Sequence, residues 1–182
     1  VQGIVTLQPG IATSANESGT VGGSFLVDPA TFVTQAALFR NGRVEPIPQV
    51  PGIDSSFVSQ LSDSGEALVS EGNFLLPTHI YKNGRMTAID LGPNVLPFMP
   101  VAMNNAGTIA GTRGVSRFTD ARGFRFDTRT GQMATLNPLP TESVAWALDI
   151  NNGGDVLGYS FISGGRERIG VWDQMGRFKT YF

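Results

Sequence analysis

The sequence predicts an all-β protein that repeats one structural unit four times. Turn-forming residues interrupt the chain roughly every 10 residues, which is typical of short strands. No stretch shows the 3.6-residue period of an amphipathic helix. Two kinds of glycine turn recur about 45 residues apart. A fixed period of this length indicates one supersecondary unit that is repeated along the chain.

The first kind of turn is rich in asparagine, serine and aspartate and ends in glycine. Such side chains bond to their own backbone, and glycine tolerates the positive φ that closes the turn. The second kind, Asn-Gly in its clearest form, suits a two-residue hairpin. The first kind occurs at Asn16–Gly19, Ser62–Gly65, Asn104–Gly107 and Asn151–Gly154. The second occurs at Asn41–Gly42, Asn83–Gly84, Thr130–Gly131 and Met175–Gly176.

Four strands are expected in each unit, in the same order around these turns. The first unit has Ile11–Ala15, Thr20–Val27, Ala36–Arg40 and Arg43–Ile47. The second has Phe57–Leu61, Glu66–Ser70, Thr78–Lys82 and Arg85–Ile89. The third has Val101–Met103, Thr108–Thr112, Gly123–Asp127 and Gln132–Leu136. The fourth has Ala145–Ile150, Asp155–Phe161, Ile169–Asp173 and Arg177–Tyr181.

Repeated antiparallel units of four strands predict a β-propeller of four blades. We expect one domain, 1–182, with units at about 11–48, 56–91, 101–137 and 145–182, and one extra strand at 1–8. An aromatic residue recurs on each third strand, and small residues on the second strands suit close sheet packing. The aromatic residues are Phe39, Tyr81, Phe126 and Trp172, and the small residues are Gly22, Gly111 and Gly158.

Two segments, 102–111 and 148–158, resemble the A-x-x-I-N-x-x-G-x-V-v-G half of the HAF family of probable extracellular repeats. Segments 35–42 and 80–89 are similar to its other half, H-A-F-L-W-x-x-G. The resemblance implies an exported, propeller-like module without agreed catalytic residues. The chain departs from the pattern at the opening histidine, where it has Gln35, Pro77, Arg122 and Arg168.

Composition narrows the class of partner. Hydrophobic residues are 41% of the 182 residues and charged residues only 15%, so part of the surface is expected to contact neighbours. A net charge of −2 gives no reason to expect nucleic acid. No apolar run is long enough to insert in a membrane, and the absence of cysteine excludes disulfides and thiolate chemistry. Because the sequence begins at Val1, we expect a removed export signal and an extracellular or cell-envelope location.

The irregular connections are expected on the propeller face opposite the short turns, where recognition usually occurs. Their arginines could hold an anionic glycan, or they could be solvated and paired with Asp120 and Glu167. The candidate binding residues are Arg113, Arg117, Phe118, Arg122, Arg166 and Arg168. Apolar loop residues could form a contact surface or fold back onto the core; they are Phe32, Phe74, Leu75, Leu76, Leu96, Phe98 and Met99.

We expect no catalytic residue, cofactor or metal site. His79, the sole histidine, lies in the apolar alternation of a strand and is expected to be packed. The glycine turns hold too few carboxylates for high-affinity calcium. A pair of carboxylates for glycoside hydrolysis can be sought only in space, and the sequence nominates none.

The extra strand at 1–8 contains the apolar residues Ile4, Val5 and Leu7. It could close the ring, belong to a larger propeller, or pair with another subunit, since an unpaired edge is a template for strand addition. We expect a non-enzymatic extracellular module for binding or structural interaction, with other protein subunits or an extracellular glycan as its partner and a homo-oligomer among the possibilities. The alternatives are a self-assembling subunit that exchanges this strand, a glycan-binding module and an enzyme.

Overall fold

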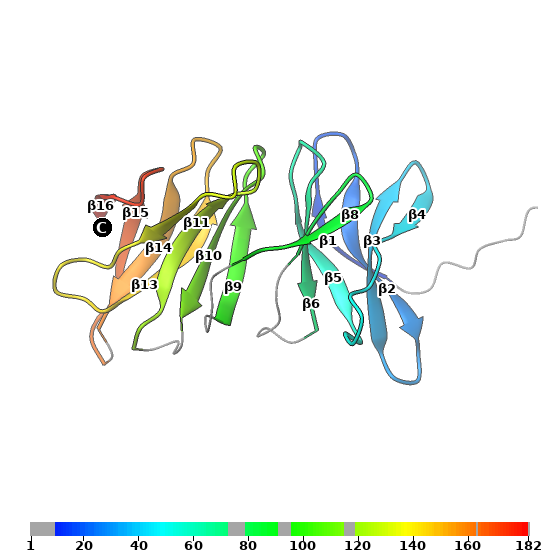
Figure 1. Ribbon diagram of the computed structural model, residues 1–182, viewed down its shortest axis with the longest axis horizontal. Helices are drawn as coiled ribbons and strands as arrows, with labels where there is room; N and C mark the ends of the chain where they lie inside the picture. Colours follow the sequence, from blue (N-terminus) through cyan, green and yellow to red (C-terminus); the bar gives the residue numbers. More distant parts are fainter. Residues whose placement is uncertain (1–9, 73–78, 91–95, 115–118, 163, 182) are drawn as a thin grey trace, which may run out of the picture. The chain divides into compact units, whose positions relative to one another are not determined.

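The computed structural model describes the chain except for residues 1–9, 73–78, 91–95, 115–118, 163 and 182 (Figure 1). The described residues form strands β1 to β16 and contain no helix, so no membrane-spanning helix is found among them. The strands make four antiparallel sheets of four consecutive strands each. The chain divides into two compact units, one with β1–β7 and most of β8, the other with β9–β16.

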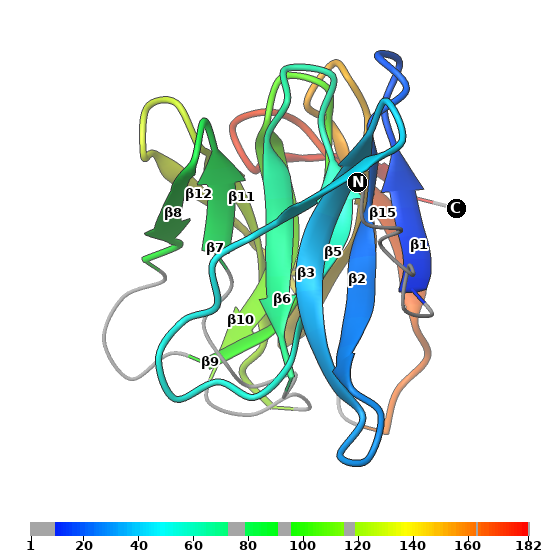
Figure 2. The same ribbon diagram turned by 90° about the vertical axis from the view of Figure 1, so that its right-hand side faces the viewer.

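The first unit holds two sheets. The first sheet contains β1 (Gly10–Ala15), β2 (Val21–Asp28), β3 (Val33–Arg40) and β4 (Arg43–Pro46). The second contains β5 (Ser56–Leu61), β6 (Ala67–Glu71), β7 (His79–Lys82) and β8 (Arg85–Ala88). The short turns of this unit lie at one end and the β2–β3 hairpin at the other (Figure 2).

The second unit also holds two sheets. The third sheet contains β9 (Leu96–Met103), β10 (Thr108–Gly114), β11 (Arg122–Asp127) and β12 (Met133–Leu136). The last sheet contains β13 (Val144–Ile150), β14 (Val156–Phe161), β15 (Arg168–Trp172) and β16 (Phe178–Tyr181). All sixteen predicted strands overlap an observed one, and the prediction of four antiparallel units is confirmed.

Two connections are shorter than the sequence suggested. The segment 92–100 was expected to be a loop, but β9 begins at Leu96 and pairs with β10 as far as Gly114. β9 contains two prolines, but it is an edge strand, where a missing N–H need not disrupt the ladder. The expected loop 28–35 is likewise reduced, because Val33, Thr34 and Gln35 pair with β2.

The first kind of turn has the predicted geometry. In the first sheet, Asn16 Oδ1 accepts the backbone N–H of Thr20 at 3.0 Å, and the N–H of Gly19 donates to Asn16 O at 3.0 Å. Asn104 and Asn151 close their turns in the same way. Ser62 does so with its hydroxyl, which accepts the N–H of Glu66 at 3.0 Å. The closing glycines have positive φ: Gly19 at 75°, Gly65 at 83°, Gly107 at 79° and Gly154 at 83°.

The asparagine of this turn also joins neighbouring sheets. Asn16 Nδ2 donates to Ser62 O at 3.1 Å, and the N–H of Glu17 donates to Asp63 Oδ1 at 3.0 Å. The same two bonds recur in the second unit. Asn104 Nδ2 donates to Asn151 O at 3.1 Å, and the N–H of Asn105 donates to Asn152 Oδ1 at 3.0 Å. We call this pair of bonds the turn clasp.

Apolar side chains fill the space between the two sheets of each unit. In the first unit, Ala36 and Leu38 of β3 pack against Val58, Val69 and Tyr81 of the second sheet. In the second unit, the cluster contains Ala102, Ala110, Leu136, Ala145, Ala147, Ile150, Val156 and Trp172. Tyr81 and Trp172 also donate hydrogen bonds back to the preceding sheet or its exit, to Glu45 Oε1 at 3.1 Å and Asn137 O at 2.8 Å.

The small residues of the second strands serve two different purposes. A Cβ on Gly22 would lie 2.5 Å from Val58 Cγ1, so this glycine permits the predicted close approach of two sheets. Gly158 was expected to act in the same way, but that reason is wrong. A Cβ there would meet Trp146 O at 2.0 Å and the Trp172 ring at 3.2 Å, both within its own sheet, beside the bulge in β13.

Exchanging the clasp asparagine for aspartate separates its two roles. Asn104→Asp keeps an oxygen that closes its own turn but faces Asn151 O with a carboxylate instead of an N–H. Because Asn104 is buried, we expect the free energy of unfolding to fall by about 1–3 kcal/mol. Asn151→Asp is the matched control, because Asn151 is exposed and closes the corresponding turn of the last sheet. Urea denaturation of both variants tests this, and equal losses would contradict it.

Candidate functional site

Arg113 and Arg122, two of the predicted binding residues, pair directly across β10 and β11. Arg113 lies at the end of β10, and its Nη2 donates to Thr135 Oγ1 at 3.2 Å. Arg122, the first residue of β11, donates from Nη1 to Ala121 O at 3.1 Å and to Ser143 O. The side chains of Arg113 and Arg122 both bond to residues of the second unit. Arg117 and Phe118 lie outside the described residues.

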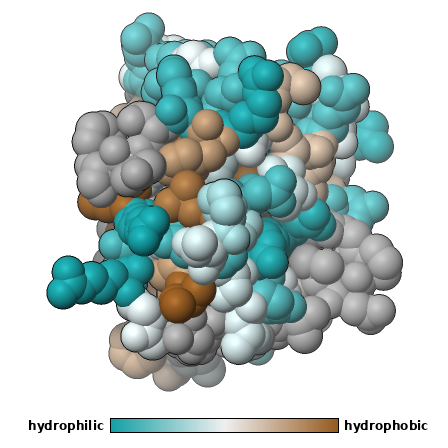
Figure 3. All heavy atoms as spheres, turned by 90° about the vertical axis from the view of Figure 1, so that its left-hand side faces the viewer, coloured by the Kyte–Doolittle hydropathy of each residue, from teal (hydrophilic) through white to brown (hydrophobic). Residues whose placement is uncertain are grey.

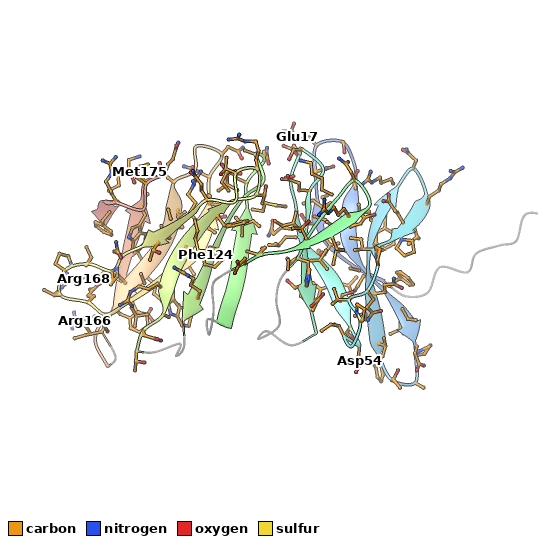
Figure 4. All side chains as sticks on the ribbon, in the orientation of Figure 1. Glu17, Asp54, Phe124, Arg166, Arg168 and Met175 are labelled. Carbon is orange, nitrogen blue, oxygen red and sulfur yellow. The ribbon has the colours of Figure 1, made fainter. Side chains whose placement is uncertain are left out.

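The last two arginines lie at the end of the last sheet that is opposite Met175 (Figure 4). Arg168 Nε lies 3.3 Å from Glu142 Oε1, and the Glu142 side chain is only 5% exposed. The sequence suggested Glu167 as the acidic partner and missed Glu142, which precedes β13. Arg166 is exposed, and no bond from it is observed to any described residue. Arg122 and Arg168 thus both hold the connection into β13.

Gln35 corresponds in strand register to these two arginines and has a similar role. Its Nε2 donates to Ile47 O at 2.9 Å, at the exit of the fourth strand of its own sheet. Three of the four positions where the HAF pattern has histidine therefore contact backbone or side chains of an inter-strand connection. The fourth, Pro77, lies outside the described residues.

The sole histidine lies against a buried acid. His79 begins β7, and its Nδ1 lies 3.1 Å from Oε1 of Glu71, the last residue of β6. The Glu71 side chain is 1% exposed and the His79 side chain 12%. Burial raises the pKa of Glu71, while the positive charge of His79 opposes that rise. This pair was not predicted, because Glu71 and His79 are separated in the sequence and only the pairing of β6 with β7 brings the two strand ends together.

Among the described residues, no three histidine or acidic side chains are grouped so as to hold a metal ion. Asp173, a carboxylate of the second kind of turn, is engaged in turn closure instead. Asp173 Oδ1 accepts the backbone N–H groups of Met175 and Arg177, both at 2.9 Å. These bonds from Arg177, backbone first and then side chain, lower the pKa of Asp173.

Exposed apolar side chains are concentrated at two places. Among the described residues, the large exposed hydrophobic side chains all belong to the first or last sheet or their turns: Ile11, Val27, Phe32, Leu148, Leu157, Ile162, Ile169 and Met175. Phe32, predicted as an apolar loop residue, is 78% exposed at a φ of 56° in the β2–β3 hairpin. Phe74, Leu75 and Leu76 lie outside the described residues, and Leu96, Phe98 and Met99 lie in β9.

One face of the last sheet is apolar and lies opposite the side that packs on the third sheet. Trp146, Tyr159 and Ile169 pair across β13, β14 and β15, and Leu157 pairs with Val171. Alternation along the strands puts them opposite Val156 and Trp172, which face the third sheet. We call these five residues the last-sheet face. Ile169 is 50% exposed and Leu157 39%, and hydrophobic side chains are visible on this side in Figure 3.

The first sheet has a corresponding face on its opposite side. Ala15, Val21, Phe39 and Val44 pair in one row across β1 to β4, and Ala12 and Pro46 belong to the next row. Alternation puts them opposite Ala36 and Leu38, which face the second sheet. We call these six residues the first-sheet face.

The comparisons with known proteins support the fold. No protein-family model matches the sequence, and no curated protein matches it. A puromycin-hydrolyzing peptidase of Mycobacterium tuberculosis matches in structure with a TM-score of 0.62 and 14% identity, over 98% of this chain and 29% of that chain. A puromycin hydrolase matches with a TM-score of 0.64 and 12% identity, over 96% and 29%. TolB from Acinetobacter baumannii matches with a TM-score of 0.59 and 17% identity, over 93% and 42%.

The matched parts of these structures are β-propeller domains, so this chain has a β-propeller fold. At such low identity the likeness shows the fold alone. The chain spans less than half the length of each of these three proteins, 29% of two of them and 42% of TolB. The resemblance to HAF repeats is not tested by these matches and stays a prediction.

The buried pair of Glu71 and His79 predicts a pH dependence of stability. The pKa of Glu71 is raised in the folded state, so unfolding makes ionisation of this carboxyl group easier. The free energy of unfolding therefore falls as pH rises from the ordinary pKa of 4.5 to the raised one. Each unit of that rise is worth about 1.4 kcal/mol. Glu71→Gln removes this loss, so the stability of the variant relative to the wild type increases with pH over that window.

Asp173→Asn is the control with the opposite sign. The lowered pKa of Asp173 contributes stability above its ordinary value of 3.8 that is lost as pH falls. The relative stability of this variant therefore decreases as pH rises from the lowered pKa of Asp173 toward 3.8, below the window of Glu71. Urea denaturation at several values between about pH 2 and pH 7 measures both slopes. A relative stability of Glu71→Gln that stays constant above pH 4.5 would show that Glu71 is not perturbed.

Proposed function

We propose that this chain is a non-enzymatic propeller module of the cell exterior that binds other protein subunits. The supporting observation is the apolar last-sheet face, on which Leu157 and Ile169 are exposed. In repeat proteins, end units usually carry polar outer faces that keep the protein soluble. The first-sheet and last-sheet faces are apolar instead, as protein contact surfaces are.

The described arginines favour protein binding over glycan binding. Arg113, Arg122 and Arg168 contact their own chain, and Arg166 is the remaining described member of the predicted set. The apolar faces therefore carry more of the argument than the loops do. Strand exchange through Ile4, Val5 and Leu7 concerns residues outside the described part. The non-enzymatic part of the proposal is supported by His79, whose ring is held between strands against Glu71.

The native size of the protein tests this function. The chain, tagged and expressed in its own cell, is expected in the extracellular or envelope fraction as a particle larger than 19.4 kDa. Ile169→Asp puts a charge on the last-sheet face and is expected to reduce the particle size, whereas Met175→Asp, at a turn tip, is not. Sedimentation of the fractions measures this. A particle of single-chain mass in that fraction would contradict the proposal.

A further inference from the structure

We propose that the last-sheet face of one copy of this chain binds the first-sheet face of a second copy, head to tail. The inference rests on the proposed function and names the partner. Three observations support it: a rule of sheet pairing that both units follow, hydrogen-bonding groups at the two ends that complement each other under that rule, and the apolar character of both faces.

The pairing rule is the turn clasp. In each unit, the turn of the earlier sheet supplies an asparagine Nδ2 and the next backbone N–H. The turn of the later sheet accepts them with a backbone oxygen and the following acidic or amide side chain. The clasp therefore has a direction, from donor turn to acceptor turn. It is formed once in the first unit and once in the second.

The last sheet keeps an unused donor turn. Asn151 accepts the clasp of Asn104 through its backbone oxygen and closes its own turn through Oδ1. Its Nδ2 and the N–H of Asn152 occupy the donor positions that Asn104 and Asn105 use. Asn151 and Asn152 are both exposed, and neither donor group is bonded to a described residue of its own unit.

The first sheet keeps an unused acceptor turn. Ser62 O, as an acceptor, receives the N–H of Gly65 and the amide of Asn16. Asn16 O receives the N–H of Gly19, and no second donor to it is observed among the described residues of the first unit. Glu17, at the tip of the same turn (Figure 4), is exposed and stands where Asp63 and Asn152 accept a backbone N–H. The donor turn of one copy thus matches the acceptor turn of another.

Side-chain size on the two faces also fits. In the first sheet, the side on which the second sheet packs carries small residues, including Gly22, Ser24 and Ala36. The matching positions of the last sheet hold Leu157, Tyr159 and Ile169. The first-sheet face offers Ala12 and Ala15, both exposed, beside Val21 and Phe39. Large side chains of one end can therefore fill the shallow parts of the other.

A symmetric contact between two last-sheet faces fits less well. It would place the donor turns of Asn151 opposite each other and leave Asn16 O and the Glu17 carboxylate without the N–H groups that the rule predicts. A head-to-tail contact uses both ends of every copy. Such contacts close into rings when the rotation permits and otherwise extend into filaments.

Purified wild-type protein, studied by light scattering after size exclusion over a range of concentrations, is expected to associate. Ile169→Asp on the last-sheet face and Ala15→Glu on the first-sheet face should each weaken association by at least about tenfold. Asn151→Asp should weaken it too, without the stability loss expected for Asn104→Asp. Met175→Asp is the matched control, since it adds a charge at an exposed apolar residue outside both faces, and should associate as the wild type does.

Mixing the two face variants tests the direction. Ile169→Asp keeps an intact first-sheet face, and Ala15→Glu keeps an intact last-sheet face. Each alone should remain a monomer, while their mixture should form a one-to-one dimer and nothing larger. Association that Ile169→Asp abolishes and Ala15→Glu leaves unchanged would show a symmetric contact and overturn the proposal.

A wild type that is monomeric at every concentration would also overturn the proposal. In that case, a loss of stability in Asn151→Asp would show that the donor turn of the last sheet is bonded within its own chain. This result is distinct from failure of the proposed function. A large native particle together with a monomeric purified chain would keep the binding role and assign it to a different protein.

Discussion

The fold depends on one asparagine side chain that bonds in two directions. Its oxygen accepts the N–H four residues ahead and closes a turn, and its amide donates to the turn of the next sheet. The closure requires the glycine at positive φ, because the chain must reverse within four residues. The clasp requires that the next sheet be close, so small residues such as Gly22 must lie beneath it. Turn and packing are therefore one constraint.

The turn of the second sheet shows what happens when one of the two roles is lost. Ser62 accepts the N–H of Glu66 with its hydroxyl and closes the turn as well as asparagine does. A serine has no amide donor, and its hydroxyl lies 2.8 Å from Ser64 Oγ within the same turn. The two clasps are formed by Asn16 and Asn104, one within each compact unit of the chain. The repeat thus preserves turn closure more strictly than the clasp.

Local chemistry made most of the fold predictable from sequence, because Asn-Gly and Asn-x-x-Gly turns fix where strands begin and end. Asn41 and Gly42, for example, have the positive φ values of 49° and 72° that a two-residue hairpin requires. The prediction of a loop at 96–100 was wrong, because this segment pairs with β10 as an edge strand without showing a clear alternation of polar and apolar residues. Contacts such as Arg168 with Glu142 were missed because they join residues that only strand register brings together. The faces could not be found either, since alternation gives two sides but not which one is covered.

The two outer faces follow from the repeat itself. Each sheet has one side suited to the sheet before it in the chain and one suited to the sheet after it, so the first and the last sheet each have one side without such a neighbour. Repeats that end in solution replace these residues by polar ones. The last sheet has larger apolar residues instead. The positions that Gly22, Ser24 and Ala36 occupy in the first sheet hold Leu157, Tyr159 and Ile169 in the last one. Exposing larger apolar side chains at that position costs solubility unless another surface covers them, and the hydrogen-bonding groups of the adjacent turn determine which surface that can be.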